Sequence, residues 1–131
     1  MPAPETYEWS AAAVVAAHTA VRDLIDGHAT LPGAVLVRDA ADVLLGTITL
    51  TDPCGTVNGT TGQLAFDFDG REEDAPAGGT IAYVEFVDGD GTVHLALPAE
   101  AGTESVSGKA VFNTLTVVAG GPIEMVSAVV G

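Results

Sequence analysis

The pattern that most constrains the fold of this chain is a change in its hydrophobic period near residue 30. Before this point, apolar residues recur at the three- and four-residue spacing of an amphipathic helix. Beyond it, short runs of alternating apolar and polar residues are separated by Gly, Asn and Asp, which favour tight turns. A single helical segment followed by a long strand pattern predicts a mainly β protein.

The helical pattern predicts a helix over residues 10–26. Ser10 is its expected N-cap, because the hydroxyl can accept a hydrogen bond from a free amide of the first turn. Gly27 is the expected glycine at its C-terminal end. We expect the helix to lie on an apolar surface through the stripe Val14, Ala17, Val21, Leu24 and Ile25.

Residues 1–9 are predicted to form an extended N-terminal arm, since Pro2 and Pro4 disfavour helix at and before their positions. Tyr7 and Trp9 bring large apolar side chains to this arm. In one interpretation, Trp9 folds back onto the core of its own chain. In the other, Tyr7 and Trp9 are partner-binding residues, because aromatic side chains often supply much of the energy of an interface.

The remainder of the chain predicts about seven short strands, a pattern typical of an antiparallel β-sandwich or jelly roll. The strand-like runs are residues 34–37, 43–50, 63–68, 80–98, 111–118 and 123–130. Residues 80–98 are expected to form a hairpin that turns at residues 88–91, and the last two runs are expected to pair. Residues 51–62 and 71–79 are predicted loops. Because 131 residues suit one core, residues 10–131 are expected to form a single domain.

The balance of charge excludes several classes of partner. The chain carries 18 acidic residues against four basic ones, and its formal net charge is -14. Nucleic acids and anionic membranes bind through clustered Lys and Arg, so neither is an expected partner. No apolar run approaches the roughly 18 residues of a membrane span. The chain also lacks the basic start of a secretory signal, so synthesis and folding in the cytoplasm are expected.

The residues that could carry chemistry form no recognisable constellation, and no catalytic, cofactor-binding or metal-binding residue is predicted. Cys54 is the one cysteine, which excludes an intrachain disulfide. His18, His28 and His94 lack the spacing of a zinc motif. A nucleophilic pair of Cys54 with His94 remains open, because their separation in space is not set by the sequence pattern.

The acidic residues between positions 67 and 74 resemble a calcium-binding loop but depart from it in two places. Arg71 stands where an EF-hand needs an oxygen ligand, and Gly70 comes one residue late. Asp88 and Asp90 are explained by turn chemistry. Cation binding by these acidic loops therefore stays open, without a predicted site.

Four segments carry a resemblance to a known family of proteins. They are VRDLIDG at residues 21–27, VLLGTITLTDPCG at 43–55, GTIAYVEFVDGDGTV at 79–93 and FNTLTVVAGGPIEMVSAVVG at 112–131. In order and spacing they resemble a family of small virion proteins of tailed bacteriophages, in which a helix precedes an antiparallel β-sandwich. The resemblance covers residues 12–131, and its motifs are structural.

The resemblance implies a non-enzymatic virion structural protein. Such a chain is expected to be a capsid decoration or cement protein, a homotrimer bound to the outside of the shell that the major capsid protein forms. The acidic surface agrees with the capsid exterior, because packaged DNA would repel it from the inside. The sequence departs from the family in Cys54 and in the acidic segment 71–77.

Two other functions remain as alternatives. One is a receptor- or glycan-binding module of a head or tail fibre, which a row of exposed aromatic residues would favour. The other is a small hydrolase that uses Cys54 or a pair of carboxylates. It would need a cleft that brings Cys54 within reach of a histidine.

Overall fold

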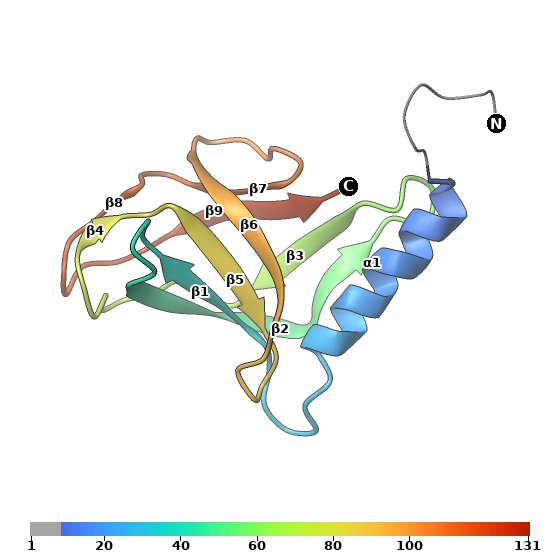
Figure 1. Cartoon of the computed structure of the whole chain (residues 1–131), viewed down its shortest axis with the longest axis horizontal. Helices are drawn as coiled ribbons and strands as arrows, with labels where there is room; N and C mark the ends of the chain where they lie inside the picture. Colours follow the sequence, from blue (N-terminus) through green and yellow to red (C-terminus); the bar gives the residue numbers. More distant parts are fainter. Residues whose placement is uncertain (1–8) are drawn as a thin grey trace.

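The computed structural model describes residues 9–131, and the arm residue Tyr7 lies outside this range. Within it the chain forms one helix, α1 (Ala11–Ile25), and nine strands (Figure 1). The strands are β1 (Ala34–Arg38), β2 (Leu44–Val57), β3 (Leu64–Phe68), β4 (Gly79–Thr80), β5 (Tyr83–Val87), β6 (Val93–Ala101), β7 (Lys109–Phe112), β8 (Thr116–Val117) and β9 (Met125–Val130). For these residues, the predictions of a mainly β fold and of an N-terminal helix are confirmed.

Seven of the strands close into a barrel in the order β1-β2-β3-β9-β7-β6-β5, and β4 pairs separately with β8. The first wall of the barrel consists of β1 and β5 with the beginnings of β2 and β6. The second wall consists of β3, β9 and β7 with the ends of β2 and β6. The expected sandwich has two separate sheets, whereas here the long strands β2 and β6 join the two walls.

One strand pair departs from the antiparallel arrangement that the sequence predicts. Strands β6 and β7 run parallel, while the other neighbours in the barrel are antiparallel. The prediction is wrong at this pair because residues 102–108 carry the chain back along β6 before β7 begins. A tight turn, by contrast, would have produced a hairpin.

Helix α1 begins and ends close to the predicted positions. The Ser10 hydroxyl accepts a hydrogen bond from the Ala13 amide at 3.1 Å, which caps the first turn. At the other end, Asp26 is the C-cap, and the preceding Ile25 is fully buried. Leu24 was expected on the apolar stripe but is 54% exposed. The buried face of the helix is therefore narrower than its spacing predicts.

The helix packs on the barrel beside the turn that connects β2 to β3. Val14 lies against Gly62, whose φ is +80°, and a Cβ at this glycine would lie 2.5 Å from the Val14 side chain. Both the left-handed backbone and the close approach of the helix therefore require glycine. One turn further along α1, the His18 imidazole donates a hydrogen bond to the Gly62 carbonyl.

The predicted hairpin over residues 80–98 is confirmed, since β5 pairs antiparallel with β6. Its turn is closed by the Asp88 carboxylate, which accepts hydrogen bonds from the Asp90 and Thr92 amides. The predicted pairing between residues 111–118 and 123–130 holds for β7 and β9. Strand β8 pairs with β4 instead, so this second hairpin is only partly correct.

Two predicted loops belong to the sheet or are bonded to it. Residues 51–57 continue β2, with an irregular register between Leu50 and Gly55 and a cis peptide bond between Asp52 and Pro53. The loop prediction was wrong here because pairing with β3 outweighs the turn-forming tendency of Gly and Pro. Segment 71–79 is held by a bridge between Glu72 and Ile123 and does not project freely.

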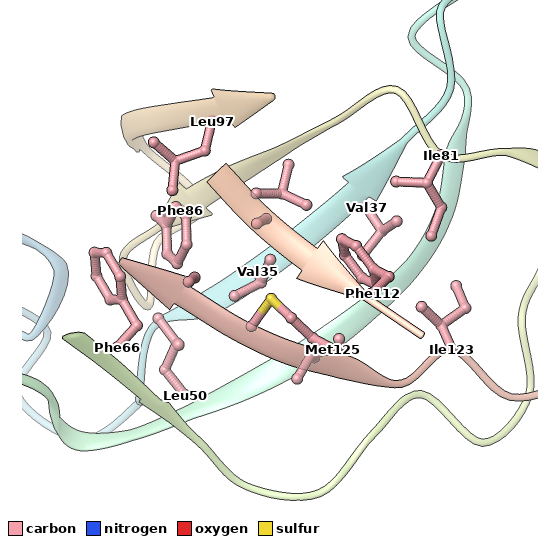
Figure 2. Close-up of a cluster of buried hydrophobic side chains, with 14 of the residues drawn as sticks. Val35, Val37, Leu50, Phe66, Ile81, Phe86, Leu97, Phe112, Ile123 and Met125 are labelled. Carbon is pink, nitrogen blue, oxygen red and sulfur yellow. The ribbon is translucent and has the colours of Figure 1, made fainter. Parts of the chain in front are cut away.

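The core fills the barrel from one wall to the other. Phe66 of β3 and Phe86 of β5 stack with their ring centroids 4.1 Å apart, although they come from opposite walls. Figure 2 shows these rings, together with Leu50, Phe112 and Met125, projecting into one interior. The barrel therefore encloses packed side chains and no channel, as expected of a barrel with few strands.

Phe86→Ala is expected to lower the free energy of unfolding by about 3–5 kcal/mol, because it deletes a buried ring that joins the two walls. Urea unfolding followed by circular dichroism measures the change. Val118→Ala is the control, since Val118 is 69% exposed, and it should shift the free energy by less than about 0.5 kcal/mol. Equal losses for the two variants would contradict the placement of Phe86 in the core.

Candidate functional site

Trp9 is the member of the predicted partner-binding pair that the structure describes, and it lies just before α1. Its side chain is 57% exposed and takes no part in the core. The interpretation in which Trp9 folds back onto its own core is therefore wrong. Contact of Trp9 with a partner stays a prediction, and Tyr7 lies outside the described residues.

Cys54 is buried beneath the end of α1. Its amide donates hydrogen bonds to the Asp26 carboxylate at 3.0 and 3.1 Å, and its thiol donates to the Arg22 carbonyl at 3.7 Å. Burial raises the pKa of the Cys54 thiol to about 12, and the nearby Asp26 carboxylate adds to this effect. The thiol therefore stays protonated at neutral pH and is a poor nucleophile.

The structure pairs His94 with an aspartate in the hairpin turn. The His94 Nε2 atom lies 2.9 Å from an Asp88 carboxylate oxygen, and this hydrogen bond lowers the pKa of Asp88. His28 lies near the same turn, with its Nε2 3.5 Å from Asp90. Its Nδ1 accepts hydrogen bonds from the Thr30 and Leu31 amides. The predicted alternative of a Cys54–His94 pair gains no support from these contacts.

The outer face of the first wall holds a second group of paired polar residues. The Arg38 guanidinium forms a salt bridge with Glu85. Next to it, the Tyr83 hydroxyl donates a hydrogen bond to Asp42 at 2.6 Å, which raises the pKa of Tyr83 to about 12. These side chains satisfy one another across β1, β5 and the turn before β2, and so hold the wall together.

The acidic segment that resembled a calcium loop is bonded to the barrel. A Glu72 carboxylate oxygen accepts a hydrogen bond from the Thr47 amide at 2.8 Å. Arg71 lies within salt-bridge distance of Glu73 and Glu124, at 2.9 and 3.6 Å. Within residues 9–131, no group of three or more His, Cys, Asp or Glu side chains is arranged to hold a metal ion.

A hollow on the second wall is a feature that the sequence did not indicate. It has a volume of about 330 Å³ and lies between β3 and β9. It is lined by Ala65, Phe66, Asp67, Phe68, Ser105, Val126, Ser127, Ala128 and Val129. The Ser127 hydroxyl is buried and has no hydrogen-bond partner in the described part of the chain. Sequence patterns carry no signal for such a hollow, because β3 and β9 are far apart along the chain.

Comparison with protein-family models, curated proteins and solved structures finds no match for the chain. The resemblance to phage virion proteins therefore remains an expectation from the sequence. Among residues 9–131, no helix has the length and apolar character needed to cross a membrane.

In the folded protein at pH 8, Cys54 is expected to react with an aromatic disulfide reagent about a thousandfold more slowly than in urea. The pKa of its thiol rises from 9.0 to about 12, and each unit of this difference of three lowers the thiolate fraction about tenfold. The absorbance of the released aromatic thiol measures both rates. Similar rates in the two conditions would show that Cys54 is accessible and ionised in the folded state.

Proposed function

We propose that this chain is a non-enzymatic structural protein of a bacteriophage virion, a capsid decoration or cement protein that binds the outside of the major capsid protein shell. The observation that carries the proposal is the exposed Trp9 at the start of α1, on a small barrel with a net charge of -14. Tryptophan is enriched at the energetic centres of protein interfaces. The resemblance of four segments to phage virion proteins supports the choice of the major capsid protein as the partner.

Charge supports the exterior of the shell as the location. The chain has four basic residues, of which Arg22, Arg38 and Arg71 already form salt bridges with Asp23, Glu85 and Glu73. A surface with so few available cations is repelled by packaged DNA and remains soluble at high local concentration. In the proposal, three copies associate into a homotrimer, with Tyr7 and Trp9 packing on a neighbouring subunit or on the shell.

The proposal includes a finer description of the fold as a flattened barrel of sandwich or jelly-roll type. Support comes from the contact between Phe66 and Phe86, because rings from opposite walls can stack only if the barrel is thin. The sharing of β2 and β6 between the walls is also compatible with strands that cross from one sheet of a sandwich to the other.

The two alternatives receive less support from the described residues. A glycan-binding face would use aromatic rings on the outside of a sheet, whereas Phe66, Phe86 and Phe112 point into the core. A hydrolase that uses Cys54 would need a reactive thiol, whereas burial raises the pKa of this one to about 12. Virion binding therefore remains the function that we propose.

Purified particles are expected to contain this chain in copy numbers close to that of the major shell protein. A decoration protein covers the whole shell, whereas a fibre or tail part occupies a few positions. Quantitative mass spectrometry of purified particles, with the major shell protein as internal standard, measures the ratio. A handful of copies per particle would contradict decoration and would favour the fibre module.

Trp9→Ala is expected to weaken binding to undecorated shells by about 2 kcal/mol or more, because it removes an anchoring aromatic side chain. Co-sedimentation of the purified chain with the shells measures the affinity. Leu24→Ala is the matched control, since Leu24 is an apolar residue near the far end of α1 and is 54% exposed against 57% for Trp9. Unchanged binding by Trp9→Ala, or equal weakening by the control, would show that Trp9 is not the anchor.

A further inference from the structure

The turn between β2 and β3 contains an Asn–Gly pair, Asn58 and Gly59, and both residues are exposed. Two backbone hydrogen bonds of 2.8 Å close this turn. The Asn58 amide donates to the Gln63 carbonyl, and the Gly62 amide donates to the Asn58 carbonyl. The turn lies beside the first half of α1, with Val14 against Gly62 (Figure 1). Asn58 therefore belongs to the turn on which the helix rests.

The side-chain carbonyl of Asn58 is held by two amides of the same turn. Its Oδ1 atom accepts a hydrogen bond from the Thr60 amide at 2.8 Å and another from the Thr61 amide at 2.9 Å. Because both partners are donors, the atom that faces them is the side-chain oxygen and not the nitrogen. Two donors on one carbonyl oxygen stabilise the negative charge that forms there when a nucleophile adds to the carbonyl carbon, Cγ.

A nucleophile lies next to this carbon in the form of the Gly59 nitrogen. Only the carbonyl carbon, Cα and Cβ of Asn58 separate the two atoms, so a bond between them closes a five-membered ring. Among residues 9–131, the Gly59 amide donates no hydrogen bond. A Cβ at Gly59 would meet nothing within 4 Å, so the space around this nitrogen is open. The attacking group is therefore free, and no side chain of its own shields it.

We infer that Asn58 is a site of spontaneous deamidation, which the chain undergoes with water as the co-reactant. The Gly59 nitrogen gives its proton to a solvent base and bonds to Cγ of Asn58. The bond from Cγ to Nδ2 then breaks, and Nδ2 leaves as ammonia with a proton from water. A second water molecule opens the cyclic imide. Opening at Cγ gives aspartate, whereas opening at the main-chain carbonyl gives isoaspartate, whose backbone runs through Cβ and Cγ.

Isoaspartate in this turn is expected to weaken the support of α1. Its backbone is longer by one carbon atom, so it changes the spacing between the ends of the turn and displaces Gly62. This glycine has little room, because a Cβ on it would lie 2.5 Å from the Val14 side chain, and its carbonyl accepts a hydrogen bond from His18. The first half of α1 therefore loosens, while the hydrogen bonds to the Asp26 carboxylate still hold its other end.

The deamidation goes beyond the proposed function, because it is a property of the isolated chain. It holds whether or not the chain is a virion protein, and its test uses no shells. The helix begins directly after Trp9 and its cap Ser10. Conversion at Asn58 would therefore also change how firmly the proposed anchor is held.

The test incubates the purified full chain at neutral and at alkaline pH and follows each asparagine by peptide mapping with mass spectrometry. Asn58 is expected to convert, and to convert faster at the higher pH, because the Gly59 nitrogen must lose its proton. Chromatography separates the aspartate and isoaspartate products. Asn113, the other asparagine of the chain, is the internal control, since it is also exposed but precedes the β-branched Thr114.

Gly59→Ala is the matched variant for the chemical step. The added methyl group has open space, and the backbone at this position has no positive φ, so the fold should be unchanged. The methyl group shields the attacking nitrogen, and conversion of Asn58 is expected to slow severalfold. Equal rates with glycine and with alanine would overturn the inference. Conversion of Asn113 as fast as that of Asn58 would do the same.

Two-dimensional NMR of the ¹⁵N-labelled chain measures the effect on the helix. Chain enriched in isoaspartate is expected to show shifted amide signals at Val14 and His18. Asn58→Asp is the matched control, because aspartate adds the same charge and can accept the same two amide hydrogen bonds without lengthening the backbone. Equal shifts in the two samples, or no shift at Val14 and His18 in either, would show that isoaspartate does not loosen α1.

Discussion

The rest of the structure depends on one constraint, which is that β2 takes part in both walls of the barrel. Its first residues pair with β1, and its last residues pair with β3 beyond an irregular stretch between Leu50 and Gly55. The walls therefore cannot separate, and the core between them must be thin. The stacking of Phe66 on Phe86 across the interior follows from this geometry. Val, Leu and Ile supply most of the buried side chains of this core, and Phe66, Phe86 and Phe112 supply its rings.

The same irregular stretch explains how the helix is attached. Where β2 changes from one partner strand to the other, the Cys54 amide is satisfied by the Asp26 carboxylate and not by a neighbouring strand. A buried amide without a partner would be costly, so the C-cap residue of α1 stabilises the bend in β2. Asp26 and Cys54 are therefore best understood as a structural pair. The raised pKa of the thiol is a consequence of this position.

Most of the side chains that could carry out chemistry are engaged in hydrogen bonds that hold the barrel together. His94 pairs with Asp88 in the hairpin turn, and Glu72 accepts a hydrogen bond from the Thr47 amide of β2. Two features of the described chain take no part in this, namely the exposed Trp9 and the hollow between β3 and β9, where the Ser127 hydroxyl has no hydrogen-bond partner. Of the two, the Trp9 side chain is of the kind that anchors contacts with another protein. Our proposal of a virion protein that acts by binding has its physical basis in this distribution of satisfied and unsatisfied groups.

The sequence by itself determined the elements whose signals are local. The Ser10 cap and the three- and four-residue spacing predict α1, and the alternation around the Asp88 turn predicts the β5–β6 hairpin, because each depends on residues close together in the chain. Only the tertiary structure decided the barrel closure, the parallel β6–β7 pair and the continuation of β2 through residues 51–57. These depend on pairing between distant segments, whose energy outweighs local turn preferences. Among the candidate site residues, the sequence singled out Trp9 by its rarity. The hollow between β3 and β9 arises because two strands remote in sequence diverge after two pairs, which no periodicity along either strand encodes.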